Sequence, residues 1–246
     1  MVAGSAFLAT AIATVFWEAM LVRYTQRRHP HEGAWTAALA MFVAAATALA
    51  VGASTTWDSR TFRVFYLFGA VLNVPWLALG TLYLLAPARV ARTARTALLV
   101  FTGFAAGAVF TAPVHGTIAP SGIPSGHDHF PALPRVLAAV GSGLGATVVL
   151  VGALWSAWRL LARRAVSDGP APSVARRLAA ANGSIALGTL ILSAGGLAQG
   201  LVSEDEGFVL SLVLGIAVIY AGFRLATQPA RTHSASTLPA LDHAAQ

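Results

Sequence analysis

Cysteine and lysine are both absent from this chain of 246 residues. Without cysteine there is no disulfide, no thiolate nucleophile and no cysteine-ligated metal. Without lysine there is no amine for a Schiff base, so a chromophore or substrate held through an imine is excluded. All 16 basic residues are therefore arginine.

Charged residues are scarce as well, at 10% of the chain, whereas 57% of the residues are hydrophobic and the mean hydropathy is +0.70. Soluble domains carry roughly 25% charged residues, so this composition requires lipid as the solvent. The net charge of +7 does not indicate nucleic acid, because the arginines lie at the ends of apolar runs and not in one basic stripe. We expect the lipid bilayer to be a partner and nucleic acid not to be one.

Seven apolar runs reach or approach the ~20 residues that a helix needs to cross the hydrocarbon. They cover residues 3–22, 34–53, 64–86, 96–113, 136–158, 178–201 and 207–226. We predict an all-α fold, a polytopic bundle of seven transmembrane helices over residues 1–228. A disordered cytoplasmic tail is predicted over residues 229–246.

The arginines predict the orientation of the bundle. Thirteen of them fall on one side of the predicted spans, and only Arg60, Arg63 and Arg135 fall on the other. Because arginine gathers in cytoplasmic loops, the amino terminus is predicted outside and the carboxyl terminus in the cytoplasm. The expected location is the inner (plasma) membrane of a bacterial cell.

The third apolar run contains Asn73, Pro75 and Trp76. Pro75 removes a backbone hydrogen bond and predicts a kink that frees a carbonyl near Val71. Asn73 needs a partner inside the bundle, because an unpaired amide in the hydrocarbon costs several kcal/mol. These residues either line a cavity for a small ligand or only shape the bundle.

Two further polar residues are candidates for a ligand pocket or a solute pathway. Glu18 lies in the first run, about one turn from its cytoplasmic end. It either pairs with Arg23 or Arg224 at the interface or takes part in ion coupling. Gln199 lies near the outer end of the sixth run, where it can face an outer vestibule.

The long outer loop between the fourth and fifth runs contains His115, His127 and His129. In an extended chain His127 and His129 would point the same way, with His115 as a third metal ligand. The alternative is a solvated, flexible loop whose histidines merely titrate near neutral pH.

Glycines four residues apart predict close helix packing in three of the runs. The pairs are Gly103 with Gly107, Gly141 with Gly145, and Gly196 with Gly200. No phosphate-binding loop, hydrolase elbow or histidine within an apolar run is present. We therefore expect neither an enzyme nor a bound cofactor.

The segment FRVFYLFGAVLNVPWLALGTLYLLAPARV, residues 62–90, resembles seven-span integral membrane proteins of high-GC bacteria to which no function is attached. The topology is similar to that of small sugar facilitators. That family typically carries prolines in its first helix and in the corresponding later one, whereas the first, second, fifth, sixth and seventh runs here have no interior proline. It also resembles the seven-span sensor modules that precede bacterial kinases and cyclases.

Three functions remain open at this stage. The first is a non-enzymatic module that senses a small ligand or scaffolds a complex, and acts through a protein partner. The second is a small-solute transporter that uses Glu18 and Asn73. The third and weakest is metal handling by the histidines of the outer loop.

Overall fold

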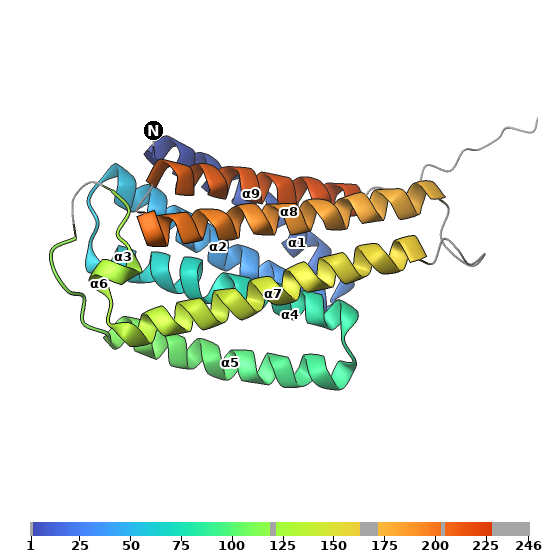
Figure 1. Cartoon of the computed structure of the whole chain (residues 1–246), viewed down its shortest axis with the longest axis horizontal. Coiled ribbons are helices and arrows are strands. Elements are labelled where there is room, and N and C mark those ends of the chain that lie inside the picture. The colour runs from blue at the N-terminus through green and yellow to red at the C-terminus, as the bar shows by residue number, and fades with distance from the viewer. Residues whose placement is uncertain (1, 119–121, 163–171, 203–204, 228–246) are drawn as a thin grey trace, which may run out of the picture.

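The structure is a computed structural model that describes residues 2–118, 122–162, 172–202 and 205–227. In these ranges the chain forms helices only (Figure 1). They are α1 (Val2–Arg27), α2 (Pro30–Ser54), α3 (Ser59–Phe65), the π-helix η1 (Tyr66–Leu72), α4 (Asn73–Leu85), α5 (Ala88–Thr111), α6 (Gly126–His129), α7 (Ala132–Ala162), α8 (Pro172–Val202) and α9 (Asp205–Thr227).

Seven helical segments within these ranges are long and apolar enough to cross a membrane, which confirms the predicted number. The α3, η1 and α4 segments together form the third of them, Ser59–Leu85. Several helices start earlier than the hydropathy predicts: α5 begins at Ala88 and α7 at Ala132. The added turns carry arginine, which lowers the hydropathy without breaking the helix. The predicted tail, residues 229–246, lies outside the described residues.

Six helices contact each other in a closed order, α1–α2–α4–α7–α8–α9, and α9 returns to α1. The remaining long helix, α5, lies outside this ring and packs on α4, η1 and α7 (Figure 1). We call the end of the bundle that carries α6 the loop end. The opposite end, where α5 begins and α7 ends, is called the arginine end.

Buried apolar side chains of the described residues form two cores. The core at the loop end joins Phe62, Tyr66, Val109 and Phe130 from four different segments. The second core joins α1, α2 and α9 through residues such as Phe16, Phe42 and Ile219. The loop end is therefore held together by its connecting loop as well as by its helices.

Close glycine contacts join α8 to α9. A Cβ atom at Gly188 would lie 2.8 Å from the Gly215 carbonyl oxygen, and one at Gly222 would lie 2.9 Å from the Ala181 carbonyl oxygen. Small residues thus let the two backbones approach, as expected in a membrane. The predicted residue Gly196 is not among these contacts, because it faces open space. The surroundings of Gly200 lie outside the described residues.

Candidate functional site

The third span is broken in its middle by a π-helix. The backbone N–H of Asn73 donates to the Phe68 carbonyl, five residues earlier, at the end of η1. Two residues later Pro75 has no N–H to donate, so a carbonyl of the preceding turn needs another donor. Ser142 of α7 supplies it: its hydroxyl lies 2.5 Å from the Ala70 carbonyl oxygen. The predicted break is present, and the carbonyl that accepts a hydrogen bond from another helix is that of Ala70.

Helix α7 lies directly against this break. A Cβ atom at Gly141 would lie 2.8 Å from the Val71 carbonyl oxygen, and one at Gly145 would lie 2.9 Å from the Pro75 nitrogen. The predicted packing role of this glycine pair is therefore confirmed. The pair Gly103 and Gly107 on α5 faces open space, so the same prediction is wrong within this chain.

The predicted pocket residues Asn73, Pro75 and Trp76 face different neighbours. The Trp76 indole N–H donates to the Thr102 hydroxyl of α5 at 3.2 Å, whereas Pro75 faces α7. The side-chain oxygen of Asn73 is buried and has no hydrogen-bond partner in the described residues, contrary to expectation. π-Helical turns and unpaired buried amides both occur often at functional sites. The break is therefore the first element of the candidate site.

The outer loop folds onto the start of the π-helix. Phe130 stacks on Phe62 with ring centroids 4.8 Å apart and lies 4.9 Å from the ring of Tyr66, the first residue of η1. A Cβ atom at Gly126 would overlap the Tyr66 ring. Ile123 is also buried, and its N–H donates to a carboxylate oxygen of Asp205 on α9 at 2.9 Å. The prediction of a solvated loop is wrong for these residues.

The histidines of this loop do not converge. Ser125 caps a helical turn at Gly126–His129, so His127 and His129 do not share one side as they would in an extended chain. His127 contacts Asp128, and His129 faces the His115 carbonyl oxygen at 3.0 Å. The Ser125 hydroxyl, followed by His127, lowers the pKa of the Asp128 carboxyl. In the described part of the chain no group of three potential ligands is placed to hold a metal ion.

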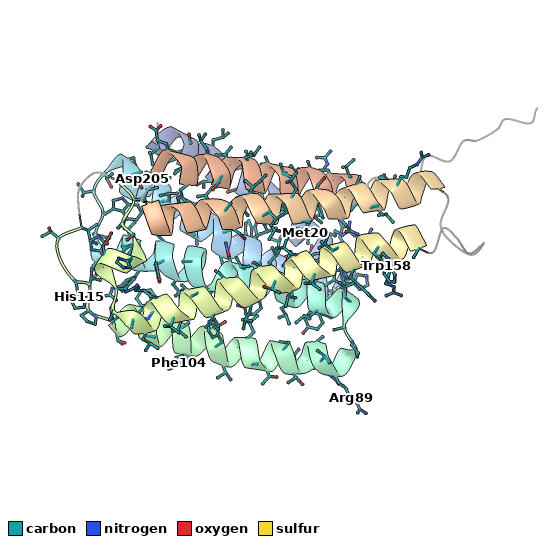
Figure 2. All side chains as sticks on the ribbon, viewed as in Figure 1. Met20, Arg89, Phe104, His115, Trp158 and Asp205 are labelled. Carbon is teal, nitrogen blue, oxygen red and sulfur yellow. The ribbon has the colours of Figure 1, made fainter. Side chains whose placement is uncertain are left out.

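A hollow of about 530 Å³ lies at the loop end beside this folded loop. Trp57, Ser59 and Arg63 line it on one side, and Val114, Gly116 and Ile118 on the other. Figure 2 shows His115, the neighbour of Val114 and Gly116, at this end of the molecule. Gly116, one of these residues, has a positive φ of 68°, a backbone conformation that favours glycine.

Arg63 holds the wall of the hollow in place. Its guanidinium donates to the carbonyl oxygens of Val109 and Ala112, the latter at 2.8 Å, and so satisfies the end of α5. Its Nε–H donates to the Ser59 hydroxyl at 3.1 Å. Arginine has five N–H donors, so two of them remain for a ligand. The indole N–H of the buried Trp57 also has no partner in the described residues.

An ion pair at the arginine end was not foreseen from the sequence. Arg23 of α1 lies 2.6 Å from Glu32 of α2, whose side chain is only 1% exposed. Glu32 precedes the apolar run of its helix, and only the early start of α2 at Pro30 reveals that it belongs to the span. The expected pairing of Glu18 with Arg23 or Arg224 is wrong. Glu18 is exposed and contacts no arginine of the described residues.

Trp35 connects this ion pair to the broken span. It lies one turn after Glu32 on α2, and its indole N–H donates to the Leu77 carbonyl of α4 at 3.1 Å. Gly80 of α4 leaves room for the indole ring, because a Cβ atom there would overlap it. The side chain of Gln199, the last predicted pocket residue, lies outside the described residues.

Contacts therefore continue from the hollow at the loop end, through the π-helix and α4, to Trp35 and the Arg23–Glu32 pair. In comparisons with protein families, curated proteins and solved structures, no family, relative or similar structure matches this chain.

Proposed function

We propose that this chain is a non-enzymatic membrane module that binds a small polar molecule at its loop end and passes the change to its arginine end. The observation that carries the proposal is the packing of Gly126 and Phe130 on Tyr66, where the π-helix begins. A ligand between α3 and the loop would alter this packing. We expect α4 to respond through the break at Pro75, because the proline interrupts the hydrogen-bond ladder of the span there.

The excess of arginine at one end supports an orientation with the loop end outside and the arginine end in the cytoplasm. The ligand would then come from outside, and a separate protein would respond in the cytoplasm. The donors that Arg63 leaves free favour a molecule with hydrogen-bond acceptor groups. Ligands of this kind are held by a few placed donors in a mixed apolar and polar pocket.

The coupling can be tested with a reporter on α4, because the chain contains no cysteine of its own. The variant Leu84→Cys gives one labelling position on the exposed face near the arginine end. We expect Gly126→Ala, which displaces the Tyr66 ring, to change the emission of a polarity-sensitive label at position 84. Gly143→Ala is the matched control, since a Cβ atom there meets open space. Equal emission from both variants would contradict the coupling.

A small-solute transporter is the second candidate, favoured by the broken span and the unpaired Asn73 oxygen at its middle. Broken helices near the membrane midplane are common at transport sites. Small carboxylates and phosphates should be screened by thermal shift and by uptake into proteoliposomes. A sensing module is expected to give a shift that Arg63→Gln weakens, without uptake. Uptake that Asn73→Ala abolishes would favour the transporter instead.

A further inference from the structure

A second hollow lies at the arginine end, on the outer surface between α4 and α7. Its volume is about 330 Å³, within the range of small-molecule pockets. Thr81 and Leu85 of α4 and Val148, Val151, Gly152 and Trp155 of α7 line it. In Figure 1, α5 and α7 lie close together at the loop end and diverge toward the arginine end.

Hydrocarbon is the natural occupant of this groove. Its lining is almost entirely apolar, and Val151 and Trp155 at its edge are 60% and 50% exposed. The groove faces sideways on a helix that is apolar enough to span a membrane. Water does not stably fill an apolar hollow without polar partners, whereas a lipid tail next to the helix can enter it.

Two arginines, Arg89 and Arg159, follow the groove residues in the chain at the arginine end of the bundle. Trp155 and Trp158 lie together with ring centroids 5.1 Å apart, and tryptophan is enriched at the headgroup level of a membrane. Arg159 follows Trp155 by four residues and so continues the same helix face toward the arginine end. Arg89 lies in the first turn of α5, just after the groove residues of α4, and Figure 2 shows it and Trp158 at this end.

These arginines have no countercharge on the helices that form the groove. The described residues of α4, α5 and α7 include no aspartate or glutamate. Neither Arg89 nor Arg159 forms an ion pair within the described part of the chain. An apolar groove that ends in unpaired arginines matches a lipid tail that ends in a negatively charged headgroup.

We infer that this groove binds one phospholipid with an anionic headgroup, its acyl chain between α4 and α7 and its phosphate near Arg89 and Arg159. The site is separate from the hollow at the loop end and does not depend on the proposed sensing function.

Tryptophan quenching in vesicles tests this inference, because Trp155 lines the groove. The full chain is placed in phosphatidylcholine vesicles that contain a small fraction of brominated phosphatidylglycerol or, in a parallel sample, brominated phosphatidylcholine. The difference between the parent and Trp155→Phe isolates the emission of Trp155. We expect the anionic brominated lipid to quench this emission more strongly than the zwitterionic one. Equal quenching by the two lipids would overturn the inference.

Variants separate the groove from general effects of the membrane. Arg159→Gln is expected to lose the preference for the anionic lipid, whereas Arg159→Lys, which keeps the charge, retains it. Val151→Phe narrows the groove and is expected to reduce quenching by both lipids. Leu154→Phe is its matched control, equally exposed to lipid but outside the groove. A preference that survives both Arg159→Gln and Val151→Phe would assign the lipid to another surface and refute the proposed site.

Discussion

Replacement of Gly145 by valine is expected to lower the free energy of unfolding by ~2–3 kcal/mol, toward the upper end of what overpacking usually costs. The reason is geometric. A Cβ atom at this position would lie 2.9 Å from the Pro75 nitrogen and 2.9 Å from the carbonyl carbon of Val74. Backbone atoms cannot rotate away from the added methyl groups as a side chain can. Helix α7 has to move off the break, and the bond from Ser142 to the Ala70 carbonyl is lost with it.

Gly107→Val is the matched control, because it makes the same substitution in the interior of another span where a Cβ atom meets open space. Both variants change the intrinsic helix preference equally. We therefore expect Gly107→Val to stay within ~0.5 kcal/mol of the parent, as surface changes usually do. Unfolding by sodium dodecyl sulfate in mixed micelles measures both values. Equal losses would show that the close approach of α7 to Pro75 contributes nothing to stability.

The contrast between these glycines shows what sequence spacing can predict. Three glycine pairs have the same separation along the chain. Of the glycines in these pairs that the structure describes, Gly141 and Gly145 lie against another backbone and the others face open space. Spacing places two glycines on one face of a helix. It does not determine whether that face turns toward the bundle or toward lipid, because the rotation of each helix depends on all of its neighbours. The number of spans, in contrast, follows from hydropathy alone.

The broken span was predictable in part. Pro75 marks the position of the break, because proline has no backbone N–H to donate to the preceding turn of the helix. The π-helical register before it was not predictable from the sequence. The hydroxyl that bonds the Ala70 carbonyl there belongs to Ser142, 72 residues away along the chain. The same limit applies to the loop. Its histidines suggested a ligand set, but the cap from Ser125 and the stacking of Phe130 on Phe62 determine where they point.

Hydropathy alone does not reveal the Arg23–Glu32 pair, because Glu32 precedes the first apolar residue of its run. Glu32 lies in the first turn of α2, before that point, and still becomes buried because α1 and α2 pack closely there. A proline followed within two residues by an acid is a usual helix start. Pro30 and Glu32 therefore mark the start of α2 in the sequence and place Glu32 within the span.

The second large effect is expected at this pair. Arg23→Ala leaves the Glu32 carboxylate buried without its partner, and its Oε2 atom already has no hydrogen bond in the described residues. Removing one member of a buried pair costs ~3–5 kcal/mol, and the 29% exposure of Arg23 reduces the expected loss to ~2–3 kcal/mol. Arg224→Ala, which removes only an exposed contact with Tyr220 at 3.3 Å, is expected to cost under ~0.5 kcal/mol.

A double variant separates the role of the charge from that of the packing. Arg23→Met combined with Glu32→Leu removes both charges and keeps apolar volume, so we expect it to recover most of the stability that Arg23→Ala loses. If the double variant is as unstable as Arg23→Ala, the loss comes from the contact of Arg23 with the Phe223 ring, 5.8 Å away, and not from an unpaired carboxylate.

The same variants test whether the pair takes part in signalling. Trp35 packs one turn after Glu32 and holds the Leu77 carbonyl of α4, so α2 and α4 should shift together when the pair is broken. The label at position 84 should therefore report Arg23→Ala as well as Gly126→Ala, although the two changes lie at opposite ends of the bundle. The double variant is expected to recover stability without either charge. If its label still emits differently from that of the parent, α4 responds to the loss of the charges and not to the loss of stability.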